Sequence, residues 1–334
     1  MAKHTRAVTS SIAAVPVALG LLAPATNTAT GTAAGHTTRH VSRTTAAPKE
    51  FSIPMANLKA WTEAVVVTMN NVRIEGHSPV HPLNNDCEMH FGAHSTAFQG
   101  SPDGLVLEPM NVCVQPFPGQ SAQNNSDWTT FGDQLVNATI SATGVPRIWP
   151  EHLQGGSASN PDHAVEMHPL TAIANGSANT DFTDNIFAGA YGGGVGEATA
   201  FSILDTATVD VTRSGAALTV SFFGGTIGNF TVLDVQIDRA SITGDGAGSF
   251  RMTGDVVTND TTVPVRLVSI KGTAMNDAIG KLRSTSSAKV SLQALVLFSL
   301  SPEALLDAAN KSNGNAQSVQ TPIQLILYGT PDDK

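Results

Sequence analysis

The stretch DCEMHFGAH, residues 86–94, holds one cysteine, two carboxylates and two histidines. Imidazole and carboxylate groups are ligands of catalytic divalent metal ions, and they also transfer protons in general acid–base catalysis. Groups of the same kind recur at Glu108 and in the run AVEMHP, which contains Glu166 and His168. Whether these residues act together depends on the strands that carry them.

Strand alternation divides residues 86–94 between two faces, because successive side chains of a strand point to opposite sides. One face is apolar and is predicted to point into a core; it consists of Cys87, Met89, Phe91 and Ala93. The other face is polar and is predicted to point to solvent; it carries Glu88, His90 and His94. His90 and His94 would lie about 13 Å apart along a strand, so they cannot bind one ion together.

The two cysteines of the chain are predicted to form a disulfide. Pairing the second strand with residues 104–113 so that Cys87 faces Cys113 also places Phe91 opposite Pro109 and Ala93 opposite Leu107. Apolar positions of one strand then face apolar positions of the other. Directly opposed residues reach disulfide range in the closer, non-hydrogen-bonded type of antiparallel pair. The alternative is two buried free thiols.

Composition favours an extracellular β protein. The chain has 334 residues, 41% hydrophobic and 13% charged, with a formal net charge of −9. This length exceeds one typical domain, which predicts two. An acidic chain repels a phosphate backbone, so nucleic-acid binding is not expected.

The first residues resemble an export signal. Lys3 and Arg6 precede a mostly apolar, uncharged run that ends in a small-residue site at Ala23–Ala25. We therefore expect a signal peptide over 1–25, a disordered linker over 26–55, no membrane span after signal removal, and a location in the cell envelope or outside the cell.

The next segment predicts a five-stranded barrel over residues 56–175. Strands are expected over 60–75, 87–95, 104–113, 137–149 and 163–173, with a helix over 126–135 that is capped by Ser126. A helix between the third and fourth strands is the order of an OB-fold.

Three motifs in this segment resemble a bacterial OB-fold family of poorly defined function. They are Asp-x-Glu-x-His at Asp86–His90, Glu-Pro at Glu108–Pro109, and Glu-x-His-Pro at Glu166–Pro169. The resemblance covers residues 60–173, departs from the family at Cys87, and implies a binding-type barrel with no established reaction.

The rest of the chain predicts an all-β continuation. Residues 176–200 read as a Gly-rich bridge, and residues 201–334 read as an antiparallel, sandwich-like β domain with one or two short helices, over 274–282 and 301–310.

The expected ligand site is the polar face of the first barrel, where Glu88, His90, Glu108, Glu166 and His168 would lie together. This is the usual ligand face of an OB-fold. Three functions are compatible with it: a non-catalytic binding protein for an extracellular saccharide or protein, a metal-assisted hydrolase, and a structural or assembly protein. We favour the first, without catalytic residues or a cofactor; a divalent metal belongs to the second alternative. A structural network of paired Glu and His is the competing interpretation of the cluster.

Overall fold

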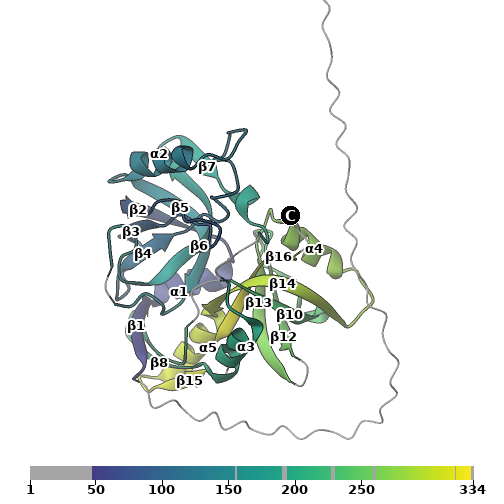
Figure 1. Cartoon of the computed structure of the whole chain (residues 1–334). Coiled ribbons are helices and arrows are strands. Elements are labelled where there is room, and N and C mark those ends of the chain that lie inside the picture. Colours follow the sequence, from purple (N-terminus) through teal and green to yellow (C-terminus); the bar gives the residue numbers. More distant parts are fainter. Residues whose placement is uncertain are drawn as a thin grey trace, which may run out of the picture. The chain divides into compact units, whose positions relative to one another are not determined.

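The computed structural model describes residues 47–154, 156–189, 194–226, 230–258, 261–319 and 321–331 (Figure 1). The predicted signal peptide, residues 1–25, and residues 26–46 of the predicted linker lie outside the described residues. The described part belongs to one compact unit, which contains two barrels and a third, four-stranded sheet. Within it, no helix is long and apolar enough to cross a bilayer.

The first barrel has the predicted order of elements. β2 pairs with β3 and β5, β3 with β4, and β5 with β6, all antiparallel, and the parallel pair β4–β6 closes the wall. This is the strand order of an OB-fold-like barrel. A short strand, β7, extends the sheet beyond β6. The elements are β2 (Val67–His77), β3 (Phe91–Ser95), β4 (Gly104–Leu107), α2 (Asn125–Leu135), β5 (Thr139–Ile148), β6 (His163–Asn175) and β7 (Ala178–Asp181).

The C-terminal half closes into a second barrel instead of a sandwich. β10 pairs with β12 and β14, β12 with β13, and β14 with β16, and the pair β13–β16 is parallel. The connectivity repeats that of the first barrel, including a helix, α4, between the third and fourth strands. The elements are β10 (Thr231–Asp238), β11 (Thr243–Gly244), β12 (Phe250–Val257), β13 (Thr262–Ser269), α4 (Ala274–Leu282), β14 (Lys289–Leu300) and β16 (Ile323–Gly329).

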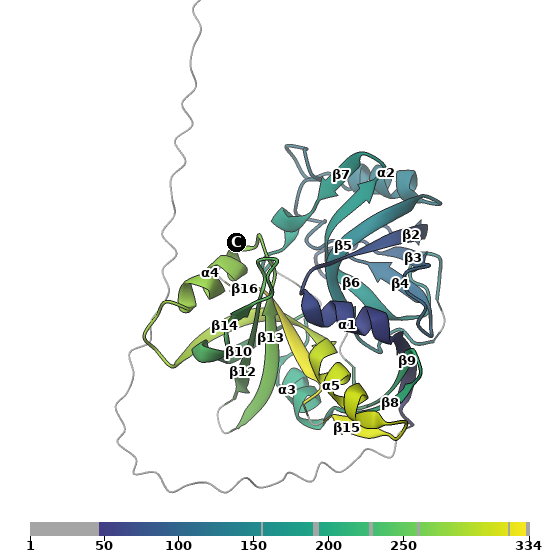
Figure 2. The ribbon, with the colours of Figure 1, turned by 180° about the vertical axis from the view of Figure 1, so that it is seen from behind.

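A third sheet, in the order β1-β9-β8-β15, lies beside the helices α1 and α5, which contact each other (Figure 2). The predicted linker over 26–55 is wrong for its last residues. Residues 49–54 form a strand that pairs with β9, and alternate side chains of this strand, Phe51 and Ile53, are buried. The elements are β1 (Lys49–Pro54), α1 (Met55–Glu63), α3 (Glu197–Thr206), β8 (Thr208–Ser214), β9 (Ala217–Phe223), α5 (Pro302–Ser312) and β15 (Gln317–Val319), with short 3-10 helices at Thr183–Asn185 and Arg239–Ser241.

Two local predictions are wrong in their details. The strand expected over 60–75 begins only at Val67, because Leu58 and Trp61 are buried three positions apart on helix α1. Helix α2 is capped by Asn124 and not by Ser126, whose backbone N–H donates to the Asn124 side chain at 3.0 Å.

The disulfide between Cys87 and Cys113 is confirmed, with a Cα–Cα distance of 5.1 Å. The hairpin register used to predict it is wrong by two residues, since Phe91 pairs with Leu107 and not with Pro109. Both cysteines lie outside β3 and β4, in the segments that flank the hairpin. A shift of two residues preserves which face each side chain occupies, so the match of core positions could not distinguish the two registers.

Candidate functional site

Strands of the first barrel bring the predicted site residues together around His168. Its Nε2 lies 2.8 Å from Glu88 Oε1, its Nδ1 contacts Glu108 Oε2, and the same Nδ1 lies 3.5 Å from Glu166 Oε2. His90 joins from the rim, with its Nε2 3.4 Å from Glu108 Oε1. The structure therefore places all five predicted residues in one connected group.

Two residues that the sequence did not single out complete the group. Arg147, on β5, lies 2.6 Å from Glu166 through its Nη1, and His163, at the start of β6, lies 3.2 Å from the other oxygen of Glu166. We call six of these residues the buried charge cluster: Glu88, Glu108, Arg147, His163, Glu166 and His168. The cross-strand pairing of Arg147 with Glu166 explains why these two side chains meet.

The prediction that this face points to solvent is wrong. Side chains of the buried charge cluster are at most 6% exposed, and only His90, at 14%, reaches the surface. Alternation correctly separates the two faces of the strands, but it cannot show what covers the outer one. Here, two other parts of the chain cover it.

The second barrel covers one part of this face. The Arg147 side chain donates through Nε to the Phe298 carbonyl at 2.9 Å, and the Ile148 backbone N–H donates to Ser299 Oγ at 3.0 Å. The ring of His168 contacts Phe230 and Tyr328, with centroids 5.6 and 6.4 Å apart. The cluster therefore joins the two barrels.

The loop between β5 and β6 covers the rest of this face of the first barrel. A Cβ atom at Gly92 would lie 2.1 Å from the Ala158 carbonyl oxygen, and one at Gly104 would lie 2.3 Å from that of Asp162. Gly76, which pairs with Gly92, also faces Ala158. Three neighbouring glycines thus let the loop backbone lie directly on the sheet.

Replacing Gly92 with alanine will displace this loop and lower the free energy of unfolding by about 1–3 kcal/mol, because the new methyl group overlaps backbone atoms. Chemical denaturation measures the change. Gly244→Ala is the matched control, since the nearest atom to its added Cβ is 4.0 Å away. Equal stability of the two variants would contradict the close packing.

Each charged group of the cluster lies against a group of opposite charge. Burial opposes a charge on His168, but Glu88 and Glu108 raise its pKa well above its ordinary value. Burial also opposes ionisation of Glu166, but Arg147 and His163 hold the pKa of that carboxyl well below its usual range. Burial raises the pKa of Glu88 to about 8, with His168 opposing the effect.

Glu108 behaves as the second ionised carboxylate of the cluster. Burial and the charge of Glu166 would raise its pKa, but His90 and His168 lower it to about 2. Burial opposes a charge on His163, but contact with Glu166 raises its pKa as well, so Arg147, His163 and His168 lie against the two carboxylates Glu108 and Glu166. A compensated, water-excluded arrangement of this kind is typical of a structural network.

Two groups of side chains have the composition and spacing of a metal site. Glu88, Glu108 and His168 form the first, and His81, Asp86 and His90 form the second, with the potential ligand atoms of each group within 4.8 Å of one another. The first group is buried, and both ring nitrogens of His168 already contact carboxylates. The second group reaches solvent.

His81, like Arg147 and His163, is a residue that the sequence interpretation did not single out for a site. It lies in the loop before β3, and its Nδ1 is 2.8 Å from Asp86 Oδ1. A His and an Asp five positions apart in an irregular loop have no periodic signal that would link them. His94, by contrast, lies apart from His90 and contacts Glu75 and Asp103 at 3.4 and 3.6 Å.

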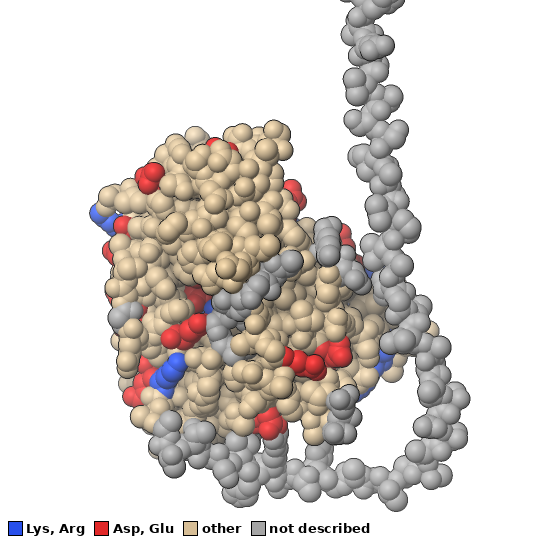
Figure 3. Space-filling model, viewed as in Figure 1, with Lys and Arg blue, Asp and Glu red and all other residues tan. Residues whose placement is uncertain are grey.

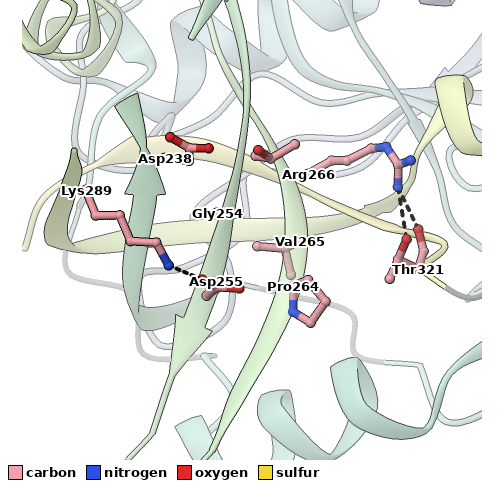
Figure 4. Close-up of a pocket in the computed structure, with 9 residues that line it drawn as sticks. Asp238, Gly254, Asp255, Pro264, Val265, Arg266, Lys289 and Thr321 are labelled. Carbon is pink, nitrogen blue, oxygen red and sulfur yellow. Dashed lines mark hydrogen bonds and ion pairs between the residues drawn. The ribbon is translucent and has the colours of Figure 1, made fainter. Parts of the chain in front are cut away.

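The second barrel carries an open groove on the face that is covered in the first barrel. It follows the outer side of β12 and β13, and Figure 4 shows the side chains that line its larger part. Two adjoining hollows, of about 320 and 180 Å³, share Thr253 and Arg266. We call this surface the β12–β13 groove; its polar lining residues include Asp238, Arg251, Thr253, Asp255, Arg266, Lys289, Glu303 and Thr321.

No family model, curated protein or solved structure matches the chain. The family resemblance of residues 60–173 therefore stays a prediction.

The buried charge cluster also makes stability depend on pH. The raised pKa of His168 adds stability that is complete below 6.5 and is lost as the pH rises through the folded value. The lowered pKa of Glu166 adds stability that is complete above 4.5 and is lost as the pH falls. Because the pKa of Glu88 is raised, the free energy of unfolding falls as the pH rises from 4.5 to about 8.

The midpoint of thermal unfolding will therefore be highest at about pH 5 and will decrease as the pH is raised to about 9. Calorimetry across this range measures the profile. Glu88→Gln will flatten the alkaline decline, because glutamine cannot ionise. A wild-type midpoint that is constant from about pH 5 to about pH 9 would show that the cluster does not titrate in this way.

Proposed function

We propose that the protein is an exported, non-catalytic binding protein that holds a short oligosaccharide in the β12–β13 groove. The observation that carries this proposal is the position of the groove. OB-fold barrels bind oligosaccharides and oligonucleotides on the face of their second and third strands, between the loops after the first and fourth strands. In the second barrel, β12 and β13 are those strands, and they line the groove.

The lining favours a ligand rich in hydroxyl groups. Basic and acidic side chains both line the groove, and two of them already have partners: Lys289 Nζ lies 3.0 Å from Asp255, and Arg266 Nη1 donates to the Thr321 carbonyl at 2.9 Å (Figure 4). Side chains held in this way offer donors and acceptors in fixed positions. Mixed signs suit an uncharged polar ligand better than a polyanion.

Other partner classes have less support. The net charge of −9 opposes nucleic acid. A protein partner would require an apolar centre of the kind that stable interfaces bury, whereas the large apolar side chains that the described surface exposes are Leu83, Val114 and Val232. Charged side chains are sparse and of both signs on the face drawn in Figure 3.

Location outside the cytoplasm is part of the same proposal. The disulfide is compatible with an oxidising compartment, and the basic start and apolar run of residues 1–25 support export. The metal-assisted hydrolase and the assembly protein remain alternatives. The buried charge cluster supports the hydrolase less well, because a catalytic ion keeps one position open to water.

A panel of soluble oligosaccharides tests the proposal on the full chain. We expect at least one neutral member to raise the thermal midpoint, and calorimetric titration to show binding that Arg266→Ala weakens at least tenfold. Arg73→Ala is the matched control, because Arg73 is an exposed arginine on β2 of the first barrel. Binding that both variants weaken equally, or that neither weakens, would place the ligand elsewhere.

A further inference from the structure

The loop between β2 and β3 gathers three potential metal ligands at the surface, far in the sequence from the β12–β13 groove. His81, Asp86 and His90 bring their ligand atoms within 4.8 Å of one another. The rings of His81 and His90 have centroids 4.5 Å apart, at an interplanar angle of 65°. Two imidazoles and one carboxylate form a common ligand set for first-row divalent metal ions.

One pair of these ligand atoms already lies close to the separation that a single ion imposes. His81 Nδ1 and Asp86 Oδ1 are 2.8 Å apart. Two ligands at zinc bond lengths and a tetrahedral angle lie about 3.3 Å apart, so an ion between them requires a movement of only a few tenths of an ångström. Asp86 Oδ1 also accepts a bond from the Glu88 backbone N–H at 3.3 Å, which orients the carboxylate.

The backbone of the loop is held in place before any ion binds. The His81 N–H donates to the Glu88 carbonyl at 2.8 Å, and the Ser78 N–H donates to the His90 carbonyl at 2.9 Å. The disulfide of Cys87 fixes the chain between Asp86 and His90. Ligands on a rigid backbone lose little conformational entropy on binding.

A carboxylate lies behind one of the histidines, as metal sites usually require. Glu108 Oε1 is 3.4 Å from His90 Nε2, and Glu108 is itself held by His168. Metal-bound histidines almost always direct their second ring nitrogen to a carboxylate or carbonyl, which fixes the tautomer. In this arrangement Nδ1 of His90 would be the metal ligand.

Solvent reaches this trio through its two histidines. The exposed side-chain fractions are 20% for His81, 14% for His90 and 9% for Asp86, whereas Glu88, Glu108 and His168 are buried. An ion can therefore enter, and water can complete its coordination. The buried group offers neither route.

We propose that His81, Asp86 and His90 bind one divalent transition-metal ion of the zinc type, with water at the remaining position. The site is independent of the proposed saccharide groove, because none of its residues lines that groove. The function proposed above and this site can each fail without the other.

Calorimetric titration of chelator-treated full-length protein with zinc chloride tests the site. We expect one equivalent that is lost, or weakened at least 100-fold, in both His81→Ala and Asp86→Asn. His94→Ala is the matched control, since His94 is an exposed histidine beside two carboxylates but outside the trio. A background variant, His4→Ala with His36→Ala and His40→Ala, removes the histidines of the N-terminal segment from the measurement.

A second measurement needs no loop variant. Cobalt(II) added to the wild-type protein is expected to give the visible absorption of a four- or five-coordinate ion, and one equivalent of zinc is expected to abolish it. Absence of this spectrum, or stoichiometric zinc binding that His81→Ala leaves unchanged, would overturn the proposal.

Discussion

Replacing Arg147 with methionine will lower the free energy of unfolding by about 3–5 kcal/mol, the usual cost of removing one member of a buried ion pair. The guanidinium is 2% exposed and lies 2.6 Å from Glu166. It also donates to the Phe298 carbonyl of the second barrel. Methionine fills similar volume but leaves Glu166 without its strongest partner. Urea denaturation monitored by circular dichroism measures the change.

The double variant Arg147→Met with Glu166→Gln separates the charge from the packing. Because it removes both charges of the pair, we expect it to recover at least about 1 kcal/mol of the loss. A single variant that costs less than about 1 kcal/mol would mean that the pair is exposed to water in solution, and the barrels would then not be joined at this point.

Replacing both cysteines with alanine will lower the free energy of unfolding by about 3.5 kcal/mol, from the entropy of a closed loop with a sequence separation of 26 residues. The loop contains β3 and β4 of the first barrel. Thermal unfolding in the presence and absence of a reductant measures the same quantity in the unmodified protein.

The double alanine variant itself serves as the control for reduction, because a reductant should not change its unfolding midpoint. An unchanged midpoint of the wild-type protein after complete reduction would contradict the prediction. Zinc affinity gives a separate readout: the variant should bind zinc more weakly if the disulfide orders the loop that carries His81 and Asp86.

Local patterns predicted much of the first barrel. The order of strands and helix follows from turn residues and alternation, and the disulfide follows from two cysteines placed on either side of one hairpin. The register did not follow, because a slip of two residues keeps Phe91 and Ala93 facing the core. The pairing of Cys87 with Cys113 therefore does not depend on the predicted register, because the segments that flank the hairpin bring the two cysteines together.

The same local patterns cannot predict which distant parts of the chain cover the outer face of a strand. His168 alternates as a solvent-facing residue would, but Phe230 and Tyr328, many residues away in the sequence, bury it. The second barrel repeats the connectivity of the first without any recurring sub-sequence, since a barrel requires strand lengths and turns and not particular residues. Sequence patterns therefore predict a ligand face on the first barrel, where the structure shows that face to be covered.

Hydrogen–deuterium exchange of the full chain, with and without the saccharide that gives the largest thermal shift, tests the central claim most directly. The claim is that ligand binds the open face of the second barrel, while the equivalent face of the first is covered by its own β5–β6 loop and by the second barrel. We predict slowed exchange in β12 and β13 and unchanged exchange in β3 and β4. Slowed exchange in β3 and β4, with β12 and β13 unchanged, would contradict it.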